Sequence, residues 1–159
     1  MLFQKKVQSL FAVSNGRASA LSDVPDEVFA SGMLGQGFAV EPLDGTVYAP
    51  ASGRVESVAE AKHAYTILTD DGLDLLVHIG IDSVTLGGEG FLPMVAVGDR
   101  VNAGDVIARV DLNILRGRNI PSVTVVVVGN SDAIEIKKTR TGKVIGGEDA
   151  VLDYRLIKS

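Results

Sequence analysis

The sequence of 159 residues contains no cysteine and no tryptophan, and only 5% of its residues are aromatic. Without cysteine the chain can form neither disulfides nor thiolate metal sites, which is compatible with a reducing compartment, and we expect a cytoplasmic protein. The longest apolar run, 123–128, includes one threonine and is too short to cross a bilayer. The first eleven residues lack the apolar region and cleavage site of a signal peptide.

Positive charge is also scarce, with 15 Lys and Arg against 20 Asp and Glu, a net charge of −5. This balance argues against a general nucleic-acid surface, although an acidic protein can bind a basic partner. The length predicts one domain with a sizeable core, which we place at 13–159. The apolar spacing and two lysines of 1–12 favour a frayed N-terminal tail over a short amphipathic helix, with at most weak peripheral membrane contact.

The body of the chain reads as short strands separated by Gly and Asp clusters. This pattern predicts an all-β fold, an antiparallel β-sandwich or barrel-like structure, with short helical turns at 25–30, capped by Asp23 or Ser22, and at 111–118. Weak similarities between 53–55 and 142–144, and between 98–111 and 146–155, suggest two related halves. The predicted strands are 17–21, 36–41, 46–49, 53–58, 64–69, 73–79, 106–110, 123–128, 143–145 and 154–157.

Both histidines of the chain lie in one predicted hairpin, His63 before its first strand and His78 near the end of its second. If Asp70 and Asp71 are the central turn residues, cross-strand partners have numbers that sum to 141, and His63 faces His78 directly. A bulge at Gly72 would change the sum to 142 and, by strict alternation, would place the rings on opposite faces.

Two imidazoles on one face suit phosphoryl transfer or metal binding, and they can also be surface residues without a task. Asp82 follows His78 closely enough to accept a ring N–H and fix the tautomer. The glycine-rich segment 85–91 is not followed by a helical pattern, so we interpret it as a connecting turn and not a phosphate loop. The segment 95–107 resembles the hairpins of biotin- and lipoyl-carrier domains but is not followed by their lysine. A zinc hydrolase is the weakest reading, because no H-x-H or H-E-x-x-H motif is present.

Several motifs together resemble the glucose-type IIA components of the bacterial phosphoenolpyruvate-dependent sugar phosphotransferase system. The likeness covers 13–159 in order, and its most specific part is the H-x-G-x-D-[ST]-V pattern at 78–84 with an upstream H-A at 63–64. The matching pieces are D-V-P-D-E-V-F-A (23–30), M-L-G-Q-G-F-A (33–39), A-P-A-S-G-R-V (49–55), K-H-A-Y (62–65), L-L-V-H-I-G-I-D-S-V-T-L-G-G-E-G-F (75–91) and V-G-D-R-V-N-A-G-D (97–105).

The resemblance implies a compact antiparallel β-sandwich of the duplicated hybrid motif, with two facing histidines in a shallow depression. It implies that His78 accepts a phosphoryl group from the phosphocarrier protein HPr and passes it to a cysteine of a sugar-specific IIB domain, while His63 stabilises that group. From its position just past His78, Asp82 is expected to orient the ring. No cofactor is required, although the two histidines could share a zinc ion with a partner. Motif matching nominates an apolar partner-binding surface, which comprises Val28, Phe29, Met33, Leu76 and Val84.

The sequence departs from the family at Ala61, where members often have a threonine that hydrogen-bonds the first histidine. Another hydroxyl, a water molecule or the Lys62 cation would have to compensate. Ser83, where threonine is commoner, is a milder change. We expect a free-standing IIA phosphocarrier without fused IIB or IIC segments. The alternatives are a regulatory binding protein of the same fold, read through the phosphorylation state of His78, and the zinc hydrolase.

Overall fold

The computed structural model describes residues 6–157, and within them strands predominate. The helical segments are short: η1 (Leu21–Asp23), α1 (Glu27–Ala30), η2 (Ser83–Leu86), α2 (Leu112–Gly117) and η3 (Ser131–Ala133). The strands are β1 (Val7–Phe11), β2 (Gly16–Ala20), β3 (Gln36–Pro42), β4 (Thr46–Tyr48), β5 (Gly53–Val58), β6 (Ala64–Thr69), β7 (Asp74–Ile79), β8 (Phe91–Pro93), β9 (Arg100–Val101), β10 (Val106–Val110), β11 (Thr124–Val128), β12 (Ile134–Thr139), β13 (Gly142–Val144) and β14 (Ala150–Leu156).

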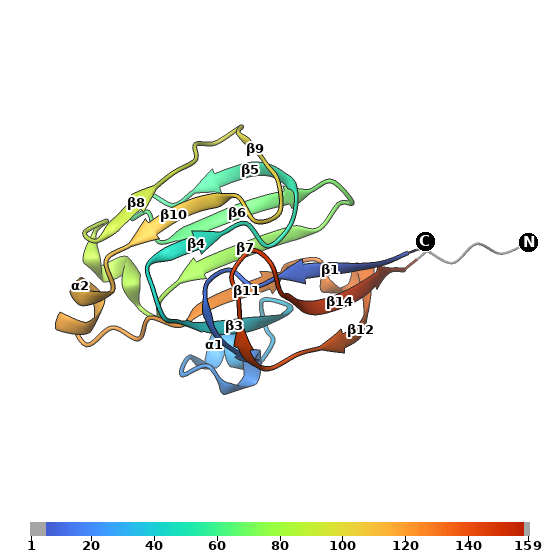
Figure 1. Ribbon diagram of the computed structural model, residues 1–159, viewed down its shortest axis with the longest axis horizontal. Helices are drawn as coiled ribbons and strands as arrows, with labels where there is room; N and C mark the ends of the chain where they lie inside the picture. Colours follow the sequence, from blue (N-terminus) through green and yellow to red (C-terminus); the bar gives the residue numbers. More distant parts are fainter. Residues whose placement is uncertain (1–5, 158–159) are drawn as a thin grey trace, which may run out of the picture.

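The strands form one large antiparallel sheet and two small ones (Figure 1). The large sheet has eight strands in the order β13-β2-β3-β11-β7-β6-β5-β9, and the small sheets have the orders β4-β10-β8 and β1-β14-β12. None of the sheets is closed. This architecture confirms the expected antiparallel β-sandwich, with β7 and β11 at the centre of the large sheet.

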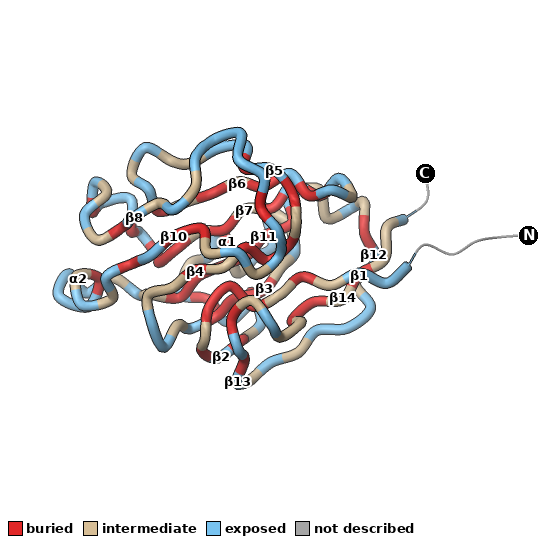
Figure 2. The backbone as a smooth tube through the Cα atoms, turned by 45° about the horizontal axis from the view of Figure 1, so that its top comes forward, coloured by how far each residue is buried: buried red, intermediate tan, exposed pale blue. Residues whose placement is uncertain are grey.

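The large sheet is covered on both faces, which explains the nearly continuous apolar sequence of β11. The main core lies between its inner face and the small sheets, and includes Tyr65, Leu75, Val77 and Leu152. A second, smaller cluster on the outer face packs η1 and α1 against β3 and β11; its members include Phe29. The burial view shows the central strands buried and the connecting loops exposed (Figure 2). The histidine site is built beside this second cluster.

All ten predicted strands have counterparts, within a few residues at their ends, but four strands were missed: β1, β8, β9 and β12. The expectation of a frayed or helical N-terminus is wrong for Val7–Phe11, which pairs with β14 over Val7↔Arg155 to Phe11↔Ala150. Tertiary pairing overrides the helical spacing there, and residues 1–5 of the expected tail lie outside the described residues. The N-cap of α1 is Asp26, which accepts from the Phe29 N–H, and not Asp23 or Ser22.

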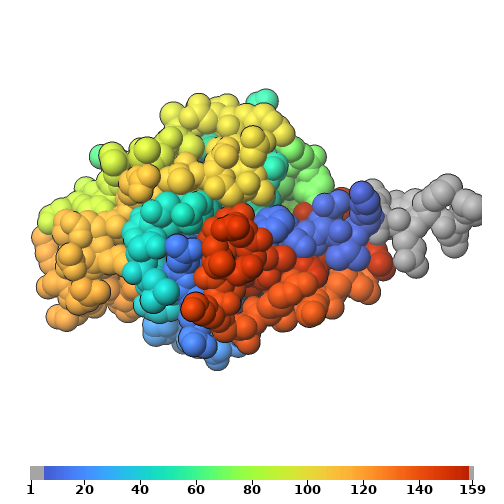
Figure 3. Space-filling view, in the orientation of Figure 1, coloured from blue at the N-terminus to red at the C-terminus, as the bar shows by residue number. Residues whose placement is uncertain are grey.

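The suggested two halves have similar turns that lie against each other. In one turn the Asn102 N–H donates to the Asp105 carboxylate at 2.8 Å, and in the other the Ile145 N–H donates to the Asp149 carboxylate at 2.7 Å. A methyl group added at Gly104 would come within 3.0 Å of the Gly147 carbonyl oxygen. The space-filling view shows segments from the middle and from the end of the chain meeting on this face (Figure 3).

Of the two registers considered for the hairpin β6–β7, the structure has the one whose partner numbers sum to 142, and not the one that sums to 141. Tyr65 pairs with Val77 and Ala64 with His78. The loop has three residues, because Thr69 and not Asp70 closes it: the Thr69 N–H donates to the Leu73 carbonyl, and Gly72 adopts φ +92°. A type I turn followed by a left-handed glycine gives this loop length, and it also places the buried residues of both strands on the inner face.

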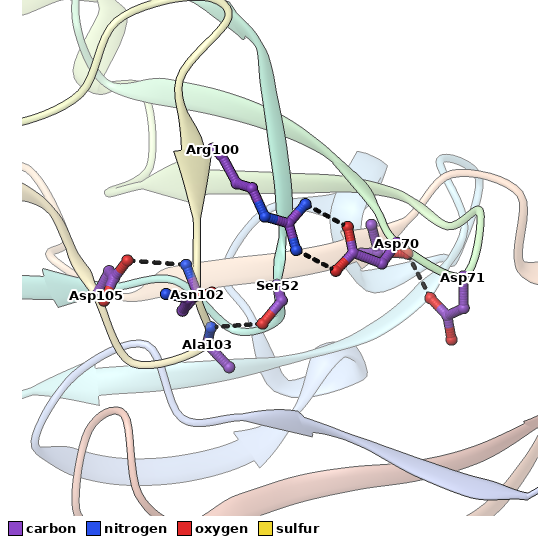
Figure 4. Close-up of polar contacts among 8 residues, drawn as sticks. Ser52, Asp70, Asp71, Arg100, Asn102, Ala103 and Asp105 are labelled. Carbon is purple, nitrogen blue, oxygen red and sulfur yellow. Dashed lines mark hydrogen bonds and ion pairs between the residues drawn. The ribbon is translucent and has the colours of Figure 1, made fainter.

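Polar contacts fix this turn to the rest of the fold (Figure 4). Arg100 on β9 makes a two-pronged ion pair with Asp70, at 2.6 and 2.8 Å. The Asp71 carboxylate accepts from the hydroxyls of Thr69 and of Tyr154 on β14. Strands β9 and β14 therefore hold the hairpin at its turn, and the histidines lie at the opposite end of the hairpin.

Candidate functional site

His78 lies on the outer face of the large sheet, near the end of β7. Alternation along β7 directs Leu75, Val77 and Ile79 into the main core and leaves Leu76 and His78 on the outer face. The imidazole is half-buried, and the Phe29 ring of α1 lies 5.0 Å from it between centroids. The sheet and α1 thus hold the ring from two sides and leave part of it accessible.

One nitrogen of His78 is already engaged. Nδ1 lies 2.8 Å from the carbonyl oxygen of Gly80. A carbonyl can only accept a hydrogen bond, so the neutral ring must carry its proton on Nδ1. Nε2 therefore bears the free lone pair, and it is the nitrogen available for bond formation.

The partner of Nδ1 is this carbonyl, and not the Asp82 carboxylate that we expected. Gly80 has φ +79°, which turns its carbonyl back toward the ring, and Asp82 has φ +59°, which starts η2 with its side chain exposed. A Cβ at Gly80 would lie 3.1 Å from the Pro121 carbonyl oxygen, so the turn requires glycine. The carboxylate of Asp82 acts on the ring only through its charge.

His63 lies beside His78 in an edge-to-face arrangement, with ring centroids 4.9 Å apart at 89°. Strict alternation in the observed register would have separated the rings, and that expectation is wrong because His63 precedes β6. Lys62 has φ +64°, and the backbone turns there before the strand begins. The His63 carbonyl still accepts from the Ile79 N–H at 2.8 Å, so the turn is joined to the end of β7.

Both rings are kept neutral by their surroundings. Burial lowers the pKa of His63. Burial is also the main cause that lowers the pKa of His78, and the neighbouring His63 adds to it; the Gly80 carbonyl and the carboxylates of Asp26 and Asp82 oppose this shift. The lowered pKa favours the unprotonated form of the His78 ring near neutral pH.

The apolar residues nominated from the motifs are exposed to different extents. Met33 is 76% exposed, Val84 55% and Val28 45%, and Leu76 is partly buried. Phe29 is only 7% exposed, so its placement on an exposed docking surface is wrong. Consecutive residues of a helix point about 100° apart, and α1 turns Phe29 onto the sheet while Val28 faces solvent. Phe29 acts as a wall of the site.

Two groups that act on the His78 ring, the Gly80 carbonyl and the Asp26 carboxylate, were not predicted from the sequence. The Gly80 carbonyl could have been found from the glycine two residues after His78, because a glycine there permits a left-handed turn. Asp26 comes close enough to influence His78 because it caps α1, and the signal was an Asp three residues before Phe29 at a helix start.

The described part of the chain has no group of three or more His, Asp or Glu residues that could hold a metal ion. The two imidazoles could supply two ligands, and a zinc ion usually takes four. A metal here would need further ligands from outside residues 6–157. No helix in this part is long and apolar enough to cross a membrane.

A neutral imidazole with one free nitrogen, a second imidazole at its edge and an exposed apolar rim fit a phosphohistidine carrier built on a β-sandwich. Comparisons with known proteins agree. Residues 8–134 match the model of a family described as phosphoenolpyruvate-dependent sugar phosphotransferase system, EIIA 1. The structure is similar to glucose permease IIA from Mycoplasma capricolum, with a TM-score of 0.87 and 35% identity over 96% of this chain and 99% of that one.

Relatives of known sequence point to the same family. A PTS system glucose-specific EIIA component of Staphylococcus aureus is 40% identical over 156 residues, covering 96% of this chain and 94% of the relative. A glucose-specific EIICBA component of Streptococcus pneumoniae is 43% identical over 143 residues, which is 89% of this chain and 20% of that longer protein. The chain belongs to the EIIA 1 family, and it is a phosphocarrier of the sugar phosphotransferase system.

Proposed function

We propose that the protein accepts a phosphoryl group from phospho-HPr on Nε2 of His78 and passes it to a cysteine of a sugar-specific IIB domain. The observation that carries this assignment is the 2.8 Å contact between Nδ1 of His78 and the Gly80 carbonyl, which leaves Nε2 as the only nucleophilic nitrogen of that ring. In the transfer, the Nε2 lone pair forms a bond to phosphorus while the bond between phosphorus and the donor nitrogen breaks.

His63 is proposed to stabilise the transferred group without carrying it. A phosphoryl group brings up to about two negative charges and three acceptor oxygens. The edge-to-face arrangement directs the edge of one imidazole toward the other, so an N–H on Nε2 of His63 can donate to such an oxygen. The smaller accessibility of His63, which is only 8% exposed, also favours His78 as the residue that a partner reaches.

Asp82 is proposed to act through its charge and not as a ring partner. Together with Asp26, it raises the pKa of His78 and so partly offsets the effect of burial. The same two carboxylates give the surroundings of His78 a negative field, which would favour partners with cationic residues near their reacting group.

The exposed apolar side chains around the histidines are the proposed docking surface for both HPr and the IIB domain. Val28, Met33 and Val84 are each at least 45% exposed, and Leu76 on β7 is partly buried against the second cluster. An apolar centre with a polar rim is typical of transient interfaces. Since the relatives are named as glucose-specific, a glucose-type IIB domain is the proposed acceptor.

The test uses purified protein with phosphoenolpyruvate, enzyme I and HPr, followed by addition of a glucose-type IIB domain. His78→Ala should accept no phosphate, because the nucleophilic nitrogen is lost. His63→Ala should accept one phosphate but pass it on slowly, because the acceptor nitrogen remains while its neighbour is lost. Thermal unfolding of both variants controls for folding. If His63→Ala blocks acceptance and His78→Ala does not, the assigned roles are inverted.

A further inference from the structure

Tyr65 carries a hydroxyl group inside the main core. The side chain is fully buried and belongs to the main core cluster, where a phenylalanine would fill the same space except for one oxygen. A buried hydroxyl without a hydrogen-bond partner is costly, so a tyrosine at such a position needs one. The Tyr65 hydroxyl donates to the carbonyl oxygen of Lys62 at 3.2 Å. It therefore acts on the backbone immediately before His63.

Lys62 is the residue at which the backbone departs from the path of a regular strand. Its φ of +64° lies in the left-handed region, which costs free energy for a residue with a Cβ. Such backbone strain persists only where the surrounding structure holds it in place. Ala64 lies opposite His78 on the outer face, so an unbroken strand would direct the His63 side chain to the inner face. The left-handed turn instead sets the His63 ring beside His78.

Hydrogen bonds fix the backbone on both sides of His63. After the ring, the His63 carbonyl accepts from the Ile79 N–H at 2.8 Å, which ties this point to the end of β7. Before the ring, the Lys62 N–H donates to the Ala59 carbonyl at 2.8 Å, and the Lys62 carbonyl accepts from the Tyr65 hydroxyl. The bond to Ala59 lies within the turn itself, whereas the bond from Tyr65 joins the turn to the main core.

We propose that Tyr65 is a positioning residue for phosphoryl transfer, because its hydroxyl holds Lys62 in the left-handed conformation. That conformation in turn sets the His63 ring against His78. Without the hydroxyl, the strain at Lys62 favours other backbone conformations, and the His63 ring spends less time beside His78. The inference rests on the proposed function only for its consequence, which is that a displaced His63 stabilises the transferred phosphoryl group less well.

The first experiment removes the hydroxyl with Tyr65→Phe, which keeps the aromatic ring in the core. Tyr154→Phe is the matched control, since Tyr154 is also a buried tyrosine and its hydroxyl donates to Asp71 at the other end of the hairpin. Nuclear Overhauser contacts between the rings of His63 and His78 are measured in the unphosphorylated protein. Tyr65→Phe should weaken these contacts. Tyr154→Phe should leave them at the wild-type level, although it destabilises the fold.

A second change, at Lys62, separates backbone strain from a loss of packing in the core. Glycine adopts a left-handed φ without steric cost, so the double variant Tyr65→Phe/Lys62→Gly should regain the ring contacts. The double variant Tyr65→Phe/Lys62→Ala removes the same cation but retains a Cβ, so it should not regain them. Equal ring contacts in the two double variants would overturn the inference.

The same variants are then assayed for transfer from the phosphorylated protein to a glucose-type IIB domain. Tyr65→Phe should lower kcat by about two- to tenfold, the range expected for one hydrogen bond, with KM for the IIB domain unchanged because the docking surface is untouched. Tyr154→Phe should retain the wild-type kcat, and Tyr65→Phe/Lys62→Gly should recover most of it. Wild-type ring contacts or a wild-type kcat in Tyr65→Phe would overturn the inference. Because the ring contacts are read without phosphate, failure of His78 to be phosphorylated would refute the proposed function alone.

Discussion

Removing one hydroxyl from Tyr154 tests how the hairpin turn is anchored. The Tyr154 hydroxyl donates to Asp71, whose other carboxylate oxygen accepts from Thr69, and the Thr69 hydroxyl in turn accepts from the Leu73 N–H at 2.8 Å. Tyr154→Phe deletes one hydrogen bond to a charged group and leaves no cavity. Such bonds contribute about 1.5–3 kcal/mol, and because Asp71 is half-exposed we expect the lower end, about 1.5 kcal/mol. For a chain of this size this corresponds to a fall in Tm of roughly 3–6 °C.

The assay is chemical denaturation followed by circular dichroism, with Tyr48→Phe as the matched control. The Tyr48 hydroxyl makes no side-chain hydrogen bond within residues 6–157, in contrast to those of Tyr65 and Tyr154. Its removal should change the free energy of unfolding by less than about 0.5 kcal/mol. Equal losses in the two variants would refute the anchoring role of the Tyr154 hydroxyl.

Three further outcomes are expected. Burial lowers the pKa of both His63 and His78, so below a pH of about 6.5 the unfolded chain binds more protons than the folded one. The free energy of unfolding should therefore fall as the pH drops through that value, and it should fall less in a variant with both His63→Gln and His78→Gln. Equal dependence on pH in the two proteins would contradict this. Gly37→Ala should destabilise the fold by about 3 kcal/mol or more in denaturation, since its Cβ would meet the Val126 carbonyl oxygen at 1.8 Å, whereas Gly117→Ala, with no atom within 4 Å, should be nearly neutral. Burial raises the pKa of Tyr65 to about 12, so stability that is present below pH 10 should be lost between pH 10 and 12, and a Tyr65→Phe variant should lose less in an alkaline titration.

Short segments between Gly and Asp clusters predicted the central strands, because these residues favour turns and interrupt strands. The register of the hairpin could not be derived with the same certainty. It depends on whether the loop has two or three residues, and that choice is made by the left-handed Gly72 together with contacts from β9 and β14, which are distant in sequence. Strand β1 was missed for a related reason, since its partner lies at the other end of the chain.

The candidate site was predicted as a set of residues but not as a set of contacts. The two histidines come together as expected, yet through the turn at Lys62 and not through regular cross-strand pairing. Sequence reasoning considered side chains as partners for His78 and so selected Asp82, whereas the structure uses the Gly80 carbonyl. Backbone groups become visible only when the turn that directs them is known.

The most direct test of the account determines which nitrogen carries the phosphate. Uniformly ¹⁵N-labelled protein is phosphorylated with phosphoenolpyruvate, enzyme I and HPr, its intact mass is measured, and the coupling between ³¹P and imidazole ¹⁵N is recorded. The account predicts a single phosphate that is acid-labile and alkali-stable and is coupled to Nε2 of His78, because the Gly80 carbonyl holds the proton on Nδ1. A phosphate on His63, or on Nδ1 of His78, would contradict it.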